Sequence, residues 1–219
     1  MAQIFSRRSN GLTTMLLAGG LITLVFIMVV AWGVLYSPYN SGQFAVPEQP
    51  VPFSHQHHAG ALGIDCQYCH TGVDRSPFAG LPDTETCMSC HSQLWTNADM
   101  LAPVRQSLAQ DRPLAWVRVH DLPDFVYFNH EAHINNGVGC ESCHGRVDQM
   151  PLTFQAKPLS MRWCLDCHNN PGPRLRPRDK VTTMGYHPAQ DPDRPTDTEL
   201  VRHYGIPQQR MTDCVTCHR

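Results

Sequence analysis

Cysteine spacing is the feature that most constrains this chain of 219 residues. All ten cysteines fall into five Cys-x-x-Cys pairs, and a histidine directly follows the second cysteine of every pair. In a helical turn, positions i, i+3 and i+4 lie on one face. Two thiols on that face can bond to the two vinyl groups of a porphyrin while the imidazole reaches its iron. Cys-x-x-Cys-His is accordingly the attachment signature of c-type haem.

Zinc ribbons and disulfides are the two alternatives for paired cysteines. Neither requires a histidine after each pair, and no cysteine is left over. We therefore predict five covalent c-type haems. The expected thioether positions are Cys66, Cys69, Cys87, Cys90, Cys140, Cys143, Cys164, Cys167, Cys214 and Cys217. The expected proximal iron ligands are His70, His91, His144, His168 and His218. In sequence order these are called the first to the fifth motif.

The N-terminal segment is the only long apolar run. Residues from Leu12 to Tyr36 form 25 nearly unbroken apolar positions, and a helix of that length reaches ~37 Å, enough to cross a bilayer. A cleaved signal peptide is the alternative, but its apolar region is usually shorter. We predict an uncleaved single-pass anchor. Because Arg7 and Arg8 precede the run, the N-terminus is expected in the cytoplasm and the remainder on the periplasmic side.

The remainder contains every proline of the chain and few apolar runs. Five haems in so little polypeptide would supply most of its interior, since units this short rarely fold without a metal or a covalent link. The expected fold class is a multihaem cytochrome c. It would combine one transmembrane helix with a loop-rich domain of short helices and little or no sheet. The formal net charge of −2 argues against a nucleic-acid-binding protein.

An internal repeat organises the motifs. Phe53-Ser-His-Gln-His-His58 precedes the first two motifs, and Phe128-Asn-His-Glu-Ala-His133 precedes the next two. We therefore predict two dihaem modules and a monohaem extension. The expected segments are a cytoplasmic stub and anchor (1–37), a linker (38–52), dihaem module 1 (53–91), a connector (92–127), dihaem module 2 (128–168), and a Pro-rich connector with the C-terminal monohaem segment (169–219).

The Phe-x-His-x-x-His pattern resembles that of multihaem cytochromes, in which the first histidine ligates the haem bound just downstream and the second reaches a neighbouring haem. By this resemblance His55 and His130 are distal ligands of the first and third haems. His58 and His133 would serve other haems of the cluster. Surface histidines are the alternative.

If the fifth iron also has two axial ligands, one further distal ligand is needed, and His120 is the first candidate. Met184 is the main competitor, and a methionine there would raise the iron's potential. Met150, His187 and His203 are further candidates, whereas His57 is expected in solvent or beside a ligand rather than bound to iron.

Two longer strings carry a more specific resemblance. Residues 119–133 (VHDLPDFVYFNHEAH) with 139–145 (GCESCHG), and residues 159–171 (LSMRWCLDCHNNP), resemble the membrane-anchored pentahaem subunit of alternative complex III. That family implies a quinol:electron-acceptor oxidoreductase in a respiratory or photosynthetic chain. Its quinol is oxidised at a polytopic membrane subunit beside an iron–sulfur subunit. The pentahaem subunit, itself without a catalytic site, relays electrons to a monohaem cytochrome c or another periplasmic acceptor.

Two other functional classes compete with this interpretation. Small anchored quinol dehydrogenases, which donate electrons to a periplasmic reductase, also have one N-terminal helix. They usually carry four haems and a short stretch between anchor and first motif, whereas this chain has five motifs and about 30 residues between Tyr36 and Cys66. Catalytic multihaem enzymes need one iron with an open position, whereas all five motifs here end in histidine and further histidines are abundant.

Overall fold

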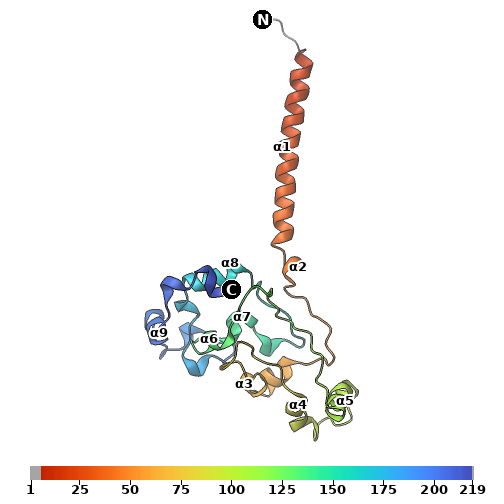
Figure 1. Ribbon diagram of the computed structural model, residues 1–219, viewed down its shortest axis with the longest axis vertical. Coiled ribbons are helices and arrows are strands. Elements are labelled where there is room, and N and C mark those ends of the chain that lie inside the picture. The colour runs from red at the N-terminus through yellow and green to blue at the C-terminus, as the bar shows by residue number, and fades with distance from the viewer. Residues whose placement is uncertain (1–5, 219) are drawn as a thin grey trace. The chain divides into compact units, whose positions relative to one another are not determined.

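The computed structural model describes residues 6–218. They form two compact units, the first ending at Gly42 and the second beginning at Gln43 (Figure 1). This boundary falls inside the predicted linker 38–52. Each unit is described by itself below.

The first unit is dominated by one long helix, α1 (Arg7–Leu35). Its 29 residues correspond to about 43 Å. The helix begins at Arg7 rather than at the expected Leu12, because the Ser6 side chain caps it by accepting a hydrogen bond from the Ser9 amide. The stretch Arg8–Leu35 is long and apolar enough to cross a membrane. A four-residue helix, α2 (Pro38–Ser41), follows and ends at Gly42, whose φ of 68° lies in the left-handed region that glycine tolerates.

The second unit is built from short helices and loops. Its α-helices are α3 (Cys66–Cys69), α4 (Thr84–His91), α5 (Ala102–Gln110), α6 (His130–Ile134), α7 (Cys140–His144), α8 (Met161–Asn169), α9 (Asp197–His203) and α10 (Cys214–Cys217). A π-helical turn, η1 (Gln56–Ala61), precedes α3. The 3₁₀ turns are η2 (Asp99–Leu101), η3 (Val147–Gln149), η4 (Gly172–Arg174), η5 (Arg178–Lys180), η6 (Pro188–Gln190) and η7 (Gln208–Arg210).

Sheet is nearly absent from this unit. Among residues 6–218 the β-pairing is a single isolated antiparallel bridge between Val138 and Leu175. The predicted fold class, a loop-rich domain of short helices after one apolar helix, is therefore confirmed.

The apolar core of the second unit is small. Its buried apolar side chains are Val51, Val73, Leu101, Val104, Met150, Leu175, Val181 and Leu200. Three of them, Val51, Leu101 and Val104, form one cluster. Such a core is slight for a unit that begins at Gln43 and ends at the C-terminus. The interior therefore depends on something other than packed aliphatic side chains.

Polar side chains cap three of the five motif helices. Asp65 accepts a hydrogen bond from the Gln67 amide at the start of α3, and Asp83 accepts one from the Thr86 amide at the start of α4, both at 2.8 Å. Ser160 caps α8 in the same way. Side-chain caps of this kind satisfy free amides and set where a helix begins. Each capped helix carries its motif cysteines within its first two turns.

The chain entering the second unit is tied to the loop that connects α7 and α8. The Phe44 amide donates to the Gln155 carbonyl, and the Gln43 side-chain amide donates to the Ala156 carbonyl, each at 2.9 Å. The Phe44 ring also lies 5.9 Å from the Phe154 ring. The second half of the predicted linker is thus part of the folded second unit.

Candidate haem sites

The five Cys-x-x-Cys-His motifs lie on α3, α4, α7, α8 and α10. The two cysteines of each pair stand one helical turn apart, and the histidine either ends the helix or directly follows it. The ten thiols take part in no disulfide. This is the local geometry in which two thiols and one imidazole share a face.

Four of the five motif histidines face a second imidazole. In each pair the partner comes from one of the two Phe-x-His-x-x-His segments. The ring centroids are 6.4 Å apart for His55–His70, 6.2 Å for His58–His91, 6.3 Å for His130–His144 and 6.0 Å for His133–His168. The first and third of these pairs are nearly parallel, with interplanar angles of 7°.

This spacing fits an iron atom between the two rings of a pair. Two metal–nitrogen bonds of about 2 Å, with about 1 Å from each nitrogen to its ring centre, place axial imidazole centroids about 6 Å apart. The four pairs, each beside two thiols, therefore fit a covalently attached haem with two axial histidines. Direct ring stacking would bring the centroids closer than this.

Hydrogen bonds fix which ring nitrogen is available. In seven of these eight histidines Nδ1 is bonded to an oxygen atom. The acceptor carbonyls belong to Gly80 for His70, Ser54 for His58, Leu94 for His91, Pro77 for His130, Asn129 for His133 and Met211 for His168, while His55 pairs with the Thr153 hydroxyl. A carbonyl only accepts, so Nδ1 carries the proton and Nε2 is left as the metal-binding nitrogen.

The repeated phenylalanine explains why the two histidine segments share one sequence pattern. Phe53 stacks on His58 at 4.4 Å and meets His55 edge-on at 4.9 Å. Phe128 stacks on His133 at 4.5 Å and meets His130 edge-on at 4.7 Å. One aromatic ring thus positions two imidazoles that belong to two different pairs.

Burial favours the neutral form of four of these imidazoles. Desolvation, with a smaller contribution from neighbouring imidazoles, lowers the pKa of His55 to about 4 and that of His144 to about 3. Desolvation also lowers the pKa of His130 and of His133. An uncharged imidazole is the form that binds a metal, so the environment favours ligation.

The fifth motif differs from the other four. Among the described residues, the ring in contact with His218 is that of Phe125, at 5.8 Å and 31°, and Nδ1 of His218 donates to the Phe125 carbonyl. His120, the first candidate for a fifth distal ligand, lies edge-on to His144 at 4.3 Å. Its buried Nε2 has no hydrogen-bond partner within residues 6–218.

The remaining candidate ligands are scattered. Met184 is half-buried and Met150 is buried. His187 and His203 are exposed, and the His203 ring contacts Tyr204. His57 is exposed and stacks on Trp95 at 5.9 Å. Its exposure agrees with the expectation from the sequence.

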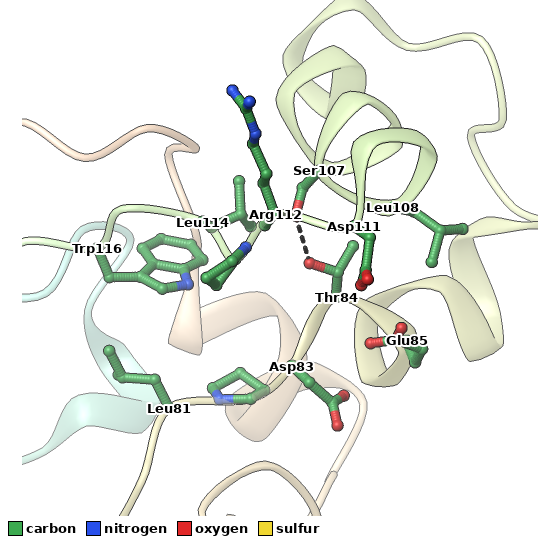
Figure 2. Close-up of a pocket in the computed structure, with 12 residues that line it drawn as sticks. Leu81, Asp83, Thr84, Glu85, Ser107, Leu108, Asp111, Arg112, Leu114 and Trp116 are labelled. Carbon is green, nitrogen blue, oxygen red and sulfur yellow. Dashed lines mark hydrogen bonds between the residues drawn. The ribbon is translucent and has the colours of Figure 1, made fainter.

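A surface hollow of about 420 Å³ lies where α4 meets α5 (Figure 2). Figure 2 shows the hydrogen bond between the hydroxyls of Thr84 and Ser107 that joins the two helices, at 2.6 Å. Three carboxylates, Asp83, Glu85 and Asp111, also line the hollow. It lies at the N-terminal end of α4, whereas His91 ends the same helix seven residues after Thr84, about 10 Å along the axis. The hollow therefore lies at the end of α4 opposite to the proposed iron ligand.

The hydrogen-bond acceptors of the imidazoles were not predictable from the sequence. Most of them are backbone carbonyls, which every residue possesses, so no residue type marks them. Thr153, bonded to His55, acts through its side chain, but no pattern in the neighbouring sequence distinguishes it from other threonines. The phenylalanine of each repeat was visible as a pattern, although its contact with both histidines was not.

Comparison with known proteins defines the class. Residues 35–111 match the class III cytochrome c family, and residues 126–219 match the family of cytochrome c7 and related cytochromes c. These families bind haem covalently through cysteines, in agreement with the motif geometry. The chain is thus a c-type cytochrome that carries more than one haem, and its role is electron transfer.

One relative of known type identifies the family more closely. The chain is 32% identical over 170 residues to the multihaem cytochrome c subunit of menaquinone reductase from Nitratidesulfovibrio vulgaris, an alignment that covers 68% of this chain and 79% of the relative. The chain belongs to the family of multihaem cytochromes c that includes this subunit.

Proposed function

We propose that this chain is the electron-relay subunit of a membrane quinone oxidoreductase and that it binds five c-type haems. The observation that carries the proposal is the set of four facing imidazole pairs, each beside a Cys-x-x-Cys pair. When bound, haem supplies reversible one-electron transfer. The axial pairs proposed are His55 with His70, His58 with His91, His130 with His144, and His133 with His168.

The fifth iron takes His218 as its proximal ligand, and its distal ligand is proposed to be His120 or Met184. Neither residue lies opposite His218 in a ring contact, so the structure does not favour one of them over the other. The His120 ring lies 4.3 Å from that of His144, which is too close for an iron between those two rings. Its unpartnered Nε2 is nevertheless free to bind a metal.

The side chains of the four pairs have three tasks. They would hold each haem iron from both sides, which would leave no coordination site for a substrate at those irons. Their Nδ1 hydrogen bonds hold each ring in one orientation, so little rearrangement accompanies a change of redox state. Burial lowers the pKa of four of them (His55, His130, His133 and His144) and so favours the neutral form that binds a metal. These properties support a relay and argue against a catalytic multihaem enzyme at those sites.

The proposed partners follow from the resemblance to alternative complex III and from the relative described above. They are an iron–sulfur subunit and polytopic quinol-oxidising subunits in the membrane, and a monohaem cytochrome c or equivalent acceptor in the periplasm. The exposed apolar helix α1 supports a single-pass anchor in the cytoplasmic membrane. By the positive-inside rule, Arg7 and Arg8 would lie in the cytoplasm and the second unit in the periplasm.

The opposite direction of electron flow is the second candidate function. The relative is named a menaquinone reductase, which implies that its complex delivers electrons to a quinone. A relay of six-coordinate irons can carry electrons from quinol to the periplasmic carrier or from the carrier to the quinone. The direction is set by the reduction potentials of the partners at its two ends.

Haem stoichiometry is a direct test of the cofactor assignment. Five intact motifs with no unused cysteine should give five haems per fully matured chain. We expect a pyridine haemochrome assay, combined with quantitative amino-acid analysis, to return that ratio. Replacing Cys214 and Cys217 with alanine should lower it by one. A ratio of four in the unaltered chain would show that one motif is not used.

Quinol-dependent reduction distinguishes a relay subunit from an anchored quinol dehydrogenase. One membrane helix does not enclose a quinone, since such sites are lined by several elements. We therefore expect slow, non-saturable haem reduction by quinol in the isolated full-length chain and rapid, saturable reduction in the assembled complex, followed at the α-band. Rapid saturable reduction of the isolated chain would contradict the relay proposal and favour the dehydrogenase class.

The same complex decides between the two directions. Pre-reduced complex mixed with menaquinone, and oxidised complex mixed with menaquinol, should show which reaction is faster at equal driving force. Faster reduction of menaquinone would favour the second candidate function.

A further inference from the structure

Two histidine turns each connect two motifs. His55 and His58 flank the start of η1, and their rings face the first and second motifs. His130 and His133 stand one turn apart on α6, and their rings face the third and fourth motifs. A hydrogen bond of 3.0 Å between the Tyr68 and Ser89 hydroxyls also joins the first two motifs directly. Motifs one and two are therefore neighbours, as are three and four.

The segment after the first motif contacts the helix that serves the third. The Pro77 carbonyl accepts hydrogen bonds from Nδ1 and from the backbone amide of His130, at 2.9 and 3.2 Å. Nδ2 of Asn135, just after α6, donates to the Asp74 carbonyl at 2.8 Å. The two modules thus meet on the side of the first and third motifs.

One loop touches the first cysteine of both motifs. The Cys140 amide donates to the Val181 carbonyl at 3.1 Å, and Sγ of Cys66 lies 4.0 Å from the carbonyl oxygen of the next residue, Thr182. Arg176, only 7% exposed, holds this loop through the Thr183 carbonyl at 2.8 Å. The first and third motifs consequently lie against the same loop.

A glycine permits a second contact at the same junction. Gly60 of η1 approaches the Asp148 carbonyl of η3 so closely that a Cβ at this position would overlap it. The Gln56 amide donates to the Met150 carbonyl at 3.0 Å. The turn that follows the third motif therefore packs on the turn that carries the distal histidines of module 1.

The second motif has a different neighbour on its outer side. The helix that carries it, α4, packs on α5 of the connector, where Thr84 bonds Ser107. Cys87 and Met88 of the motif pack against the Val51, Leu101 and Val104 cluster. This side of α4 is covered by the chain's own connector.

The fifth motif is attached to module 2. The Met211 carbonyl, just before α10, accepts the Nδ1 hydrogen bond of His168 from the fourth motif, at 2.8 Å. The Tyr127 amide, just before Phe128, donates to the Cys217 carbonyl at 2.8 Å. The fifth motif thus lies at the end of the cluster away from α4.

From these contacts we propose that the haem-binding motifs follow one another in space in the order second, first, third, fourth, fifth. The second and fifth motifs would then be the two ends of the relay, and the first and third motifs its central junction. In Figure 1 the helices α4, α3, α7 and α8 succeed one another across the second unit. The inference rests on the haem and axial roles proposed above.

Selective reduction of single irons tests this order by counting neighbours. Methionine in place of an axial histidine raises the potential of that iron. In partly reduced holoprotein, a His58→Met iron is therefore ferrous and diamagnetic while the others remain ferric. A ferric neighbour then loses its dipolar coupling, which changes its electron paramagnetic resonance signal. We expect His58→Met to change one remaining ferric signal and His55→Met to change two.

The reverse count would overturn the proposal. If the motifs followed their order in the sequence, His58→Met would change two signals and His55→Met one. His57→Met is the matched control, because this exposed neighbour faces no motif histidine, and it should change none. If His58→Met and His55→Met raise no potential, the axial assignment is wrong. In that case, two double variants remove one haem each, irrespective of axial ligands: Cys87 and Cys90 to alanine remove the second, and Cys66 and Cys69 to alanine remove the first. The number of remaining ferric signals that change, one and two respectively, then tests the order.

Discussion

Expressed without haem attachment, the chain should fail to form a cooperatively folded second unit. Eight buried apolar side chains, three of them in one cluster, are the main apolar core of the described residues. The facing imidazoles would have no metal to join them, and segments far apart in sequence would lose their covalent links to a common group. Small units with such cores depend on metals or covalent links for stability.

Thermal unfolding followed by circular dichroism measures this effect. The holoprotein should show one or more cooperative transitions, and the chain produced without haem-attachment machinery should show none apart from the helicity of α1. The variant with Cys214 and Cys217 replaced by alanine is the matched control. It should lose only the terminal haem and keep a cooperative transition. A cooperative transition in the haem-free chain would show that side chains alone build the core.

His130→Ala should convert one low-spin iron to high spin, a loss of about one fifth of the low-spin signal if five haems are bound as proposed. The His130 ring lies 6.3 Å from that of His144 and parallel to it, so its removal opens the sixth position of that iron alone. Electron paramagnetic resonance of the oxidised protein would detect the new high-spin species. His57→Ala is the control, because His57 is exposed and stacks on Trp95 rather than facing a motif histidine, and it should leave the spectrum unchanged. An unchanged spectrum for His130→Ala would contradict the pairing.

The same measurement identifies the fifth distal ligand. If His120 binds the fifth iron, His120→Ala should also create one high-spin haem, and Met184→Ala should not. The opposite result would assign the position to Met184. If both variants leave the spectrum unchanged, neither residue is the ligand.

Covalent chemistry explains why so much was predictable from the sequence. Haem attachment requires two cysteines and a histidine at fixed spacing, so the five motif positions and their helical turns follow directly from the residues. The apolar helix was equally plain, although its start at Arg7 depended on the Ser6 cap. Repeated Phe-x-His-x-x-His segments identified the histidines that the structure brings opposite motif histidines.

Contacts between modules were not predictable for a physical reason. The junction of the first and third motifs depends on loops around Pro77 and Val181, whose residues show no periodicity and act through backbone carbonyls. The position of His120 against His144 is of the same kind. It results from the path of the long connector, on which local sequence imposes few constraints.

The Nδ1 hydrogen bonds differ in how far they reach along the chain. His58 and His133 bond carbonyls four residues earlier, within their own turn. His168 depends on Met211, which is 43 residues later, and His218 depends on Phe125, which is 93 residues earlier. During synthesis the His58 and His133 rings can adopt their final orientation as soon as their turn emerges. The fourth motif, by contrast, must wait for nearly the last residues of the polypeptide, so the order in which sites reach their final form differs from the order in which their cysteines are made.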